Sequence, residues 1–362
     1  MSSHFRGPGF VVPALALLSV SITACGDGSR LFGPDTRPSP PVSTPGPTPV
    51  THQREWFIWT EKDGLTVEPY PLGVTLVSPE AINEKGEVAG TLLMDNGISP
   101  RAFFWSPSRG FIHPLGEGME ASQGAGLDDD GNVVGYFGNQ REAFIWNEAR
   151  GLRSLVLRLP YLYTLGASAG QVFGNALGAR EGLTVVFPYR LDLASSRVEE
   201  LPVASGAGGG VYDVNRLNEA VGYDGYIDHG FGGTSDAVIW DRSGTRTIVL
   251  PCGGEWGCFA YLYAINADGL AVGSLTKEEG QIRRVFRWSR ATGLEFLGVP
   301  GGGYDVGVVD VSDDGSILAK NGTQGFIFKP TGAVTVIKPP ADRTIVQPRA
   351  MNRHGQVVGM LF

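Results

Sequence analysis

Residues Ala264–Gly273 read AINADGLAVG, and versions of this segment recur along most of the chain. A short apolar run ends at an Asn, a Gly follows three residues later, and a second apolar run ends in Val-Gly. The side chain of an Asn caps its own turn, and a Gly readily takes the positive φ that a tight hairpin requires. The segment therefore predicts a β-hairpin, and its recurrence predicts a repeat protein.

The hairpin segments alternate with an aromatic segment that resembles Ala-Phe-x-Trp. The hairpin versions are Ala81–Gly90, Gly126–Gly135, an eroded one at Gly166–Gly174, Asp213–Gly222, Ala264–Gly273, Val311–Ala319 and Ala350–Gly359. The aromatic segments end at Trp59, Trp105, Trp146, Trp240, Trp288 and Phe328, with steps of 46, 41, 94, 48 and 40 residues. The long step hides one eroded copy near Val185–Tyr189, so the period is about 45 residues, the spacing of propeller blades.

Segments such as AFFW (Ala102–Trp105) are apolar at both parities, which predicts strands covered on both faces by neighbouring sheets. The repeat region opens with one half of a unit (Trp56–Val67) and closes with the other half (Ala350–Gly359). If the two halves share a sheet, no edge strand stays exposed. We therefore predict an all-β fold over residues 54–362, a β-propeller of seven four-stranded blades closed by strands from both ends, with six or eight blades as the alternatives.

These units resemble the HAF-repeat family of predicted extracellular repeat proteins, whose unit pairs Ala-Phe-x-Trp with Gly-x-x-x-Leu-Gly, a Gly-Gly loop, Ala-x-x-Ile-Asn and Gly-x-Val-Val-Gly. The likeness covers residues ~54–362 and rests on the periodicity of the copies. The resemblance implies a propeller-like fold and an extracellular address, and it brings no established biochemical activity.

Residues 1–24 contain Arg6, an apolar run and no acidic residue, which is typical of a secretory signal. The run ends in Ile22-Thr23-Ala24-Cys25, which resembles the lipobox of bacterial lipoproteins. That resemblance implies lipidation of Cys25, attachment to a membrane and, in the absence of Asp after the cysteine, the outer membrane. An ordinary signal peptide, with Cys25 left free, is the alternative. We expect residues 25–53, rich in Pro, to form an extended stalk.

The bulk composition excludes one class of partner. The formal net charge is -8, and Lys and Arg do not cluster along the chain, so nucleic-acid binding is not expected. Apart from the lipid anchor we expect no membrane contact, and we expect a monomer.

Cys252 and Cys258 lie six residues apart in PCGGEWGC, and an oxidising compartment would let them form a disulfide. A zinc site or a reactive thiol is the alternative, but no His or further Cys lies nearby in the sequence. The run Asp128–Asn132 (DDDGN) suits a calcium loop, yet the same register in other repeats holds turn sequences such as NADG. A hairpin turn explains it better, and we expect no metal and no cofactor.

Three Gly-rich loops occupy the same place in three consecutive units: Ser205–Asp213, Pro251–Cys258 and Val299–Asp305. In a ring they would converge at the mouth of the central channel, and ligands of rigid β scaffolds bind on such loops. The predicted ligand-binding residues there are Tyr212, Asp213, Glu255, Trp256, Tyr261, Tyr304 and Asp305. The alternative is that the tyrosines only cap strand ends and the glycines only make room near the axis.

No catalytic motif is present, since the five His residues occur singly and no nucleophile or phosphate-binding signature is found. The sequence thus favours a non-catalytic recognition or scaffold module for an extracellular glycan or protein. The first alternative is a propeller hydrolase or lyase that acts on polysaccharide through carboxylates such as Asp213 and Asp305. The second is a purely structural envelope component.

Overall fold

The computed structural model describes residues 54–94, 100–112, 121–138, 142–156, 162–168, 170–180, 183–204, 208–228, 232–255, 257–277, 282–298 and 306–362. They belong to one compact unit, Thr51–Phe362, and form 28 β-strands and no helix. Within these ranges, accordingly, no helix is long and apolar enough to cross a membrane. The predicted all-β class is confirmed. The signal segment, Cys25 and nearly all of the stalk lie outside the described residues.

The strands form antiparallel units of four, named here by their strands. The first unit whose four strands are consecutive in the sequence holds β3 (Val74–Ile82), β4 (Val88–Met94), β5 (Pro100–Ser106) and β6 (Gly110–Ile112). The next holds β7 (Ser122–Leu127), β8 (Val133–Phe137), β9 (Glu142–Asn147) and β10 (Gly151–Val156). The third holds β11 (Leu162–Ser168), β12 (Gln171–Arg180), β13 (Leu183–Asp192) and β14 (Val198–Glu200), and it occupies the eroded copy.

Three further units follow along the chain. The fourth unit holds β15 (Gly208–Val214), β16 (Ala220–Asp228), β17 (Gly232–Trp240) and β18 (Arg246–Leu250). The fifth holds β19 (Cys258–Ile265), β20 (Ala271–Lys277), β21 (Ile282–Ser289) and β22 (Gly293–Phe296). The sixth holds β23 (Gly307–Val311), β24 (Ile317–Lys320), β25 (Gly325–Phe328) and β26 (Val334–Ile337). The β15–β18 and β19–β22 units join in one eight-stranded sheet through a short parallel pairing of β17 with β19.

The two ends of the Thr51–Phe362 unit share a sheet. Strands β1 (Glu55–Thr60) and β2 (Gly64–Glu68) combine with β27 (Val346–Met351) and β28 (Val357–Leu361) in the order β2-β1-β28-β27. In the antiparallel pairing of β1 with β28, Trp56 lies opposite Met360 and Trp59 opposite Val357. The strand that carries the first aromatic segment therefore completes the sheet begun by the last hairpin.

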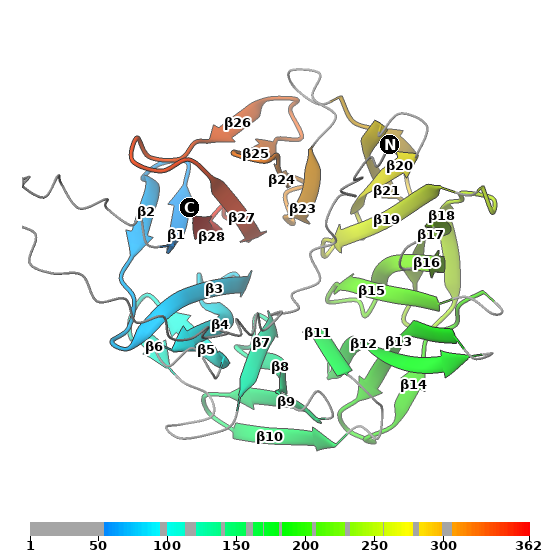
Figure 1. The fold of residues 1–362 in the computed structure, drawn as a ribbon, viewed down its shortest axis with the longest axis horizontal. Coiled ribbons are helices and arrows are strands. Elements are labelled where there is room, and N and C mark those ends of the chain that lie inside the picture. The colour runs from blue at the N-terminus through cyan, green and yellow to red at the C-terminus, as the bar shows by residue number, and fades with distance from the viewer. Residues whose placement is uncertain are drawn as a thin grey trace, which may run out of the picture. The chain divides into compact units, whose positions relative to one another are not determined.

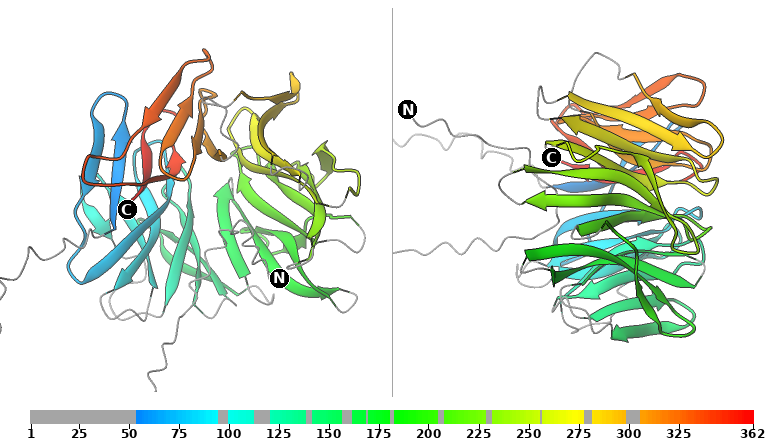
Figure 2. Two further views of the ribbon diagram at one scale, coloured as in Figure 1. Left: turned by 45° about the horizontal axis from the view of Figure 1, so that its top comes forward. Right: turned by 90° about the vertical axis from the view of Figure 1, so that its right-hand side faces the viewer.

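The units follow one another around a common centre, with the first strand of each unit innermost (Figure 1). Consecutive inner strands contact each other from β3 through β7, β11, β15, β19, β23 and β27, and β27 contacts β3. Figure 2 shows from the side that the units are twisted sheets stacked one on the next. The inner strands of the seven units therefore lie next to one another around this centre.

A separate hydrophobic core fills each gap between neighbouring units. Phe103 packs with Trp56 and Val358 on one side of β5, whereas Phe104 packs with Phe144 and Trp146 on the other side. All four residues of AFFW (Ala102–Trp105) are buried, as the apolar pattern at both parities predicts. Side chains alternate between the two faces of a strand, so each aromatic segment supplies two cores at once.

The hairpin turns of the repeat have the predicted geometry. Gly269 has a φ of +80°, and the equivalent Gly355 has a φ of +71°. In the β15–β16 hairpin the position is held by Asn218, whose φ is +59°. Asn is the residue after Gly that most readily tolerates this conformation, so the turn forms here with Asn in place of Gly.

Candidate functional site

A β-bulge interrupts the inner strand of every unit at the same point of the repeat. One residue on the inner strand has no partner on the second strand, directly before the residue that starts the Ala-Ile-Asn segment. Such bulges re-aim a side chain, and they are common beside functional sites. The seven bulge positions are Glu80, Ala125, Leu165, Tyr212, Tyr263, Val309 and Arg349.

Two neighbouring units fill this position and its surroundings with tyrosines. Tyr212 and Tyr263 occupy bulge positions, and their ring centroids lie 5.2 Å apart. Tyr223 and Tyr261 complete the group, with centroids 5.4 Å apart. We call these four residues the tyrosine cluster. Tyr212 and Tyr263 are half-buried, whereas Tyr223 and Tyr261 are buried, so the first two residues keep some solvent-accessible surface.

Burial raises the pKa of the hydroxyls of Tyr212, Tyr223 and Tyr261. It raises the pKa of Tyr223 to about 12, and it places those of Tyr212 and Tyr261 well above the ordinary value, with the neighbouring tyrosines adding to the shift. These three hydroxyls therefore stay protonated at physiological pH. Among the described residues the buried Tyr261 hydroxyl has no hydrogen-bond partner with good geometry, and the nearby Ser235 hydroxyl donates to the Ala260 carbonyl, 3.3 Å away.

Across the centre, the equivalent positions hold charged residues. Glu80 and Arg349 occupy the bulge positions of two neighbouring units, and Lys320 occupies on β24 the position that Tyr223 has on β16. We call Glu80, Lys320 and Arg349 the charged cluster. Burial raises the pKa of Glu80, and the two cations oppose that shift. Burial lowers the pKa of Lys320 to about 8, with Arg349 contributing in the same direction and Glu80 opposing it.

Two buried carboxyl groups stand directly after bulge positions. Asp213 accepts hydrogen bonds from its neighbour Val214 N (2.7 Å) and from Ile265 N (2.9 Å) of the next unit. Asp310 repeats this arrangement with Val311 N (2.7 Å) and Met351 N (2.8 Å). Burial raises the pKa of each to about 7, and for Asp310 the charge of Asp213 adds to the shift. Since both oxygens of each carboxyl are occupied, these residues link neighbouring units.

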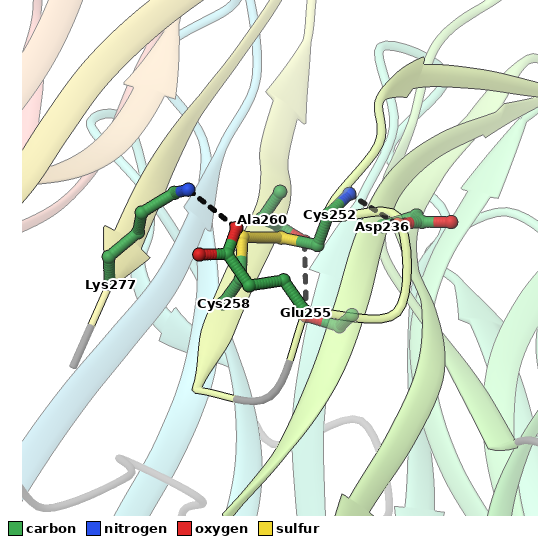
Figure 3. The surroundings of a disulfide bond; sticks show 7 residues. Asp236, Cys252, Glu255, Cys258, Ala260 and Lys277 are labelled. Carbon is green, nitrogen blue, oxygen red and sulfur yellow. Dashed lines mark hydrogen bonds and ion pairs between the residues drawn. A yellow bond between two sulfur atoms is a disulfide. The ribbon is translucent and has the colours of Figure 1, made fainter. Parts of the chain in front are cut away.

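The predicted disulfide between Cys252 and Cys258 is confirmed, and it closes the loop between β18 and β19 (Figure 3). Asp236 holds this loop by accepting a hydrogen bond from Cys252 N, 2.6 Å away. Glu255 lies on the exposed side of the loop and pairs with Lys277, with 2.6 Å between Nζ and Oε2. The loop therefore keeps Glu255 in solvent, outside the tyrosine cluster.

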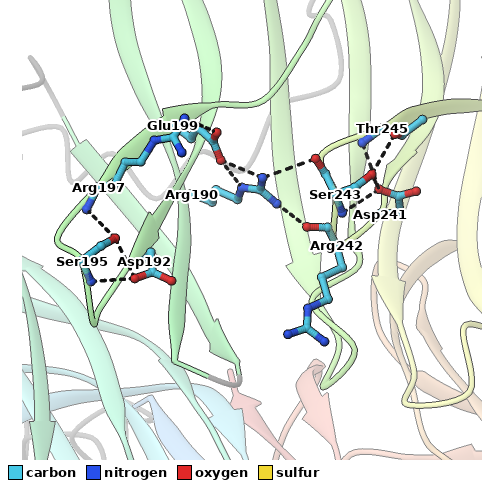
Figure 4. Close-up of polar contacts among 9 residues, drawn as sticks. All are labelled: Arg190, Asp192, Ser195, Arg197, Glu199, Asp241, Arg242, Ser243 and Thr245. Atoms are coloured by element: carbon cyan, nitrogen blue, oxygen red, sulfur yellow. Dashed lines mark hydrogen bonds and ion pairs between the residues drawn. The ribbon is translucent and has the colours of Figure 1, made fainter.

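A surface pocket of about 200 Å³ lies on the β11–β14 unit, lined by Gln171, Arg190, Asp192, Ser195, Arg197 and Glu199. Figure 4 shows that Arg190 bridges Glu199 and the turn that contains Arg242, with 2.7 Å to the Glu199 carboxylate and 2.6 Å to the Arg242 carbonyl. The Ser195 backbone N–H and hydroxyl lower the pKa of Asp192. Arg190 and Arg197 thus pair with Glu199 inside the pocket, and Asp192 is held by Ser195.

Of the seven residues predicted to bind ligand, the structure brings Tyr212 and Tyr261 together and places Asp213 beside them as an inter-unit link. Trp256, Tyr304 and Asp305 lie outside the described residues. Asp128 caps its own turn, with its Oδ1 2.8 Å from Asn132 N. Within the part of the chain that is described, no group of three or more His, Cys, Asp or Glu side chains is placed to hold a metal ion.

Sequence reasoning missed Tyr223, Tyr263 and the charged cluster. Tyr263, Glu80 and Arg349 share a simple signal, since each directly precedes the Ala that starts an Ala-Ile-Asn or Ala-Met-Asn segment. Aligning the copies on that Ala would have shown that the preceding position varies between aromatic, charged and aliphatic residues. A position that varies within an otherwise regular repeat is a candidate for function.

No protein-family model matches the sequence, and no curated protein matches it. Among solved structures it is similar to virginiamycin B lyase from Staphylococcus aureus, with a TM-score of 0.50 and 10% identity over 80% of this chain and 98% of that one. The β-propeller domain of the Trilobed protease from Pyrococcus furiosus matches with a TM-score of 0.53 and 14% identity, over 78% of this chain and 88% of that one. Acylaminoacyl peptidase from Pyrococcus horikoshii matches with a TM-score of 0.54 and 10% identity, over 77% and 48%. These similarities show that the Thr51–Phe362 unit has a β-propeller fold over the part that they cover.

Proposed function

We propose that this chain is an exported, lipid-anchored protein of the HAF-repeat type whose seven-bladed propeller binds an extracellular glycan at its centre. The observation that carries the proposal is the tyrosine cluster, in which equivalent positions of neighbouring units hold adjacent, half-buried tyrosines. Aromatic rings offer a large apolar face at little conformational cost, and their hydroxyls can bond to polar ligands.

Several features support a closed ring of seven blades. The described part of the chain forms five sheets of four strands and one of eight that divides into two units, which gives seven units. The pairing of β1 with β28 would join the two ends of the ring. A hydrophobic core lies between the β23–β26 unit and the sheet that contains β28, as it does between other neighbouring units. A closed ring leaves no edge strand free to pair with other chains. Small-angle scattering of the purified protein should fit a compact disc and not an open rod.

Export and anchoring rest on residues 1–24 and on Cys25. The disulfide between Cys252 and Cys258 supports the export proposal, because such bonds persist in oxidising compartments. In a bacterial host, the wild-type chain should incorporate labelled palmitate and partition into detergent, whereas Cys25→Ser should remain in the aqueous phase. Equal partitioning of both forms would exclude lipidation at Cys25.

Glycan binding is tested with the full chain, extracted in detergent and applied to a glycan array. Tyr212→Ala and Tyr263→Ala should each weaken binding by about tenfold, since each removes one accessible ring. Tyr70→Ala, which alters a half-buried tyrosine between β2 and β3, is the control and should bind as wild type does. Unchanged binding in both cluster variants would place the ligand elsewhere, and capture of a protein and no glycan would replace the glycan proposal.

We propose binding in preference to hydrolysis. Of the two carboxylates named for the hydrolase alternative, Asp305 lies outside the described residues. Asp213 accepts hydrogen bonds from two backbone N–H groups, one at each carboxyl oxygen, which favours a structural role for it. Assaying the bound polymer for new chain ends after incubation tests this choice. Cleavage that Asp213→Asn abolishes would favour the hydrolase.

A further inference from the structure

The three members of the charged cluster lie close enough to influence one another but do not pair. The charges of Arg349 and Lys320 both act on Glu80, and Arg349 acts on Lys320. Nevertheless, no ion pair within 4.0 Å joins any two of them, although all three belong to the described residues. Glu80 instead accepts a hydrogen bond from the Ser78 hydroxyl at 2.7 Å.

Among the described residues, neither Arg349 nor Lys320 has a carboxylate within 4.0 Å. The Nε atom of Arg349 is buried and has no hydrogen-bond partner among the described residues. The pKa of Lys320 is lowered because burial, together with the nearby charge of Arg349, disfavours its charged form. Buried charges are costly unless they are paired, so an anion placed between Arg349 and Lys320 would be stabilising. A local excess of positive charge is notable in a chain of net charge -8.

The tyrosine cluster lies on the opposite side of the same centre. Figure 1 places β3 and β27 on one side and β15 and β19 on the other. The bulge positions Glu80, Arg349, Tyr212 and Tyr263 are equivalent in the repeat, so they stand at the same level along the axis. A ligand at that level would meet two cations and a carboxyl on one side and aromatic faces on the other.

We propose that the centre binds an acidic glycan, with the carboxylate of a uronic acid residue held by Arg349 and Lys320 and the sugar rings placed against Tyr212 and Tyr263. This assignment rests on the proposed function and names the class of its ligand. A guanidinium matches a carboxylate in geometry and can bond to it through two parallel N–H donors. In this proposal Glu80 accepts hydrogen bonds from sugar hydroxyls, and its negative charge weakens the binding of free anions.

The test uses the full chain and two forms of one probe, an oligogalacturonate and the same oligomer with its carboxyls methyl-esterified. Calorimetric titration should show the acidic form binding at least about tenfold more tightly, as expected for charge-assisted hydrogen bonds. Arg349→Met and Lys320→Met should remove this preference, while the control Arg216→Met, an exposed cation on the β15–β16 turn, should retain it. Raising the salt concentration should reduce the preference for the acidic form.

Glu80→Gln provides a test that misfolding cannot imitate. This variant keeps an acceptor for the Ser78 hydroxyl and removes the negative charge, so it should bind the acidic oligomer several-fold more tightly than wild type. If both probe forms bind equally in wild type and in Arg349→Met, the acidic-glycan assignment is wrong while glycan binding stands. If neither these probes nor any glycan on the array binds, the proposed function itself fails.

Discussion

The side-chain nitrogen Nδ2 of Asn352 donates a hydrogen bond to the backbone carbonyl of Asn83, 3.0 Å away and 269 residues earlier in the chain. Asn352 belongs to the last hairpin and Asn83 to the first, so this bond joins the two ends of the repeat region. The bond lies at the turn side of the inner strands, next to the pairing of β27 with β28. It therefore supplements the contact between the first and last inner strands.

The same bond recurs between units that are neighbours along the chain. Asn83 donates to the Asp128 carbonyl (3.1 Å), Asn215 to the Asn266 carbonyl (3.0 Å) and Asn266 to the Ser312 carbonyl (3.0 Å). In every case the Oδ1 atom of the same Asn caps its own turn, as Asn266 does by accepting from Leu270 N at 2.9 Å. The Asn of the repeat thus stabilises its own hairpin and also links it to the next unit.

Asn266→Asp should separate these two roles. An Asp keeps the oxygen that caps the turn but loses the donor to Ser312, and it sets a carboxylate against a backbone carbonyl in a site that is 5% exposed. We expect a loss of about 1–3 kcal/mol in the free energy of unfolding, measured by urea denaturation. Asn321→Asp is the matched control, because Asn321 also caps an exposed turn, and its cost should stay within about 0.5 kcal/mol. Equal effects would mean that the link between units contributes nothing.

Gly273→Ala should be destabilising for a steric reason. A Cβ built on Gly273 would lie 1.9 Å from the Tyr261 carbonyl oxygen and 2.8 Å from Cζ of Phe286, which packs across the strand. Relief of such contacts typically costs about 1–3 kcal/mol or more, and thermal unfolding should show the loss. Gly322→Ala is the control, because nothing lies within 4 Å of a Cβ at that position. A loss of stability no larger than that of the control would show that β20 moves away from these contacts at no measurable cost.

The hairpins, the strands buried on both faces and the disulfide could be predicted because each depends on residues close together in the sequence. AINADG contains its own turn cap and its own positive-φ residue, and PCGGEWGC contains both half-cystines. The β11–β14 unit shows the limit of this signal. It keeps the four strands and the positive φ of Gly170 although its sequence lacks the Asn and the Trp. There the spacing of the flanking units was the better guide.

The candidate site could be predicted only in part, because it depends on which side chains different units bring to the centre. Glu80 and Arg349 become neighbours only when the first and last units meet, and no local pattern records that contact. Conversely, Glu255 and Tyr261 are close in sequence but separate in space, since the disulfide loop turns outward before β19 begins. Nearness along the chain was a poor guide to which residues share a site.

The disulfide offers a prediction that needs no loss of packing. Its loop spans only six residues in sequence, so constraint of the unfolded chain should contribute about 2–3 kcal/mol at most. Adding a reductant should therefore lower the urea midpoint of the wild-type protein. The double variant Cys252→Ala/Cys258→Ala should start at or below that lower midpoint, because it also removes two buried sulfur atoms, and it should show no response to the reductant. A wild-type midpoint that the reductant leaves unchanged would show that the bond adds no stability.

Stability should fall as the pH rises from about 4 to 7, because Asp213 and Asp310 have pKa values raised to about 7 in the fold. In the unfolded chain an Asp titrates near 3.9, so between these values the native state binds more protons than the unfolded state. The stabilisation is complete below about pH 4 and is lost as the pH passes 7, with a slope that approaches about 1.4 kcal/mol per pH unit for each group.

Urea denaturation of the wild type and of Asp310→Asn between pH 5 and 8 isolates this effect. The variant loses one hydrogen bond at every pH, which gives a constant offset, but it also loses one titrating group, so its stability should depend less steeply on pH. Asp192→Asn is the control. The pKa of Asp192 is lowered by Ser195, so its contribution changes only below about pH 4 and the slope above pH 5 should match that of the wild type. Parallel curves for wild type and Asp310→Asn would mean that the Asp310 carboxyl is already ionised at pH 5, with its two backbone hydrogen bonds outweighing the cost of burial.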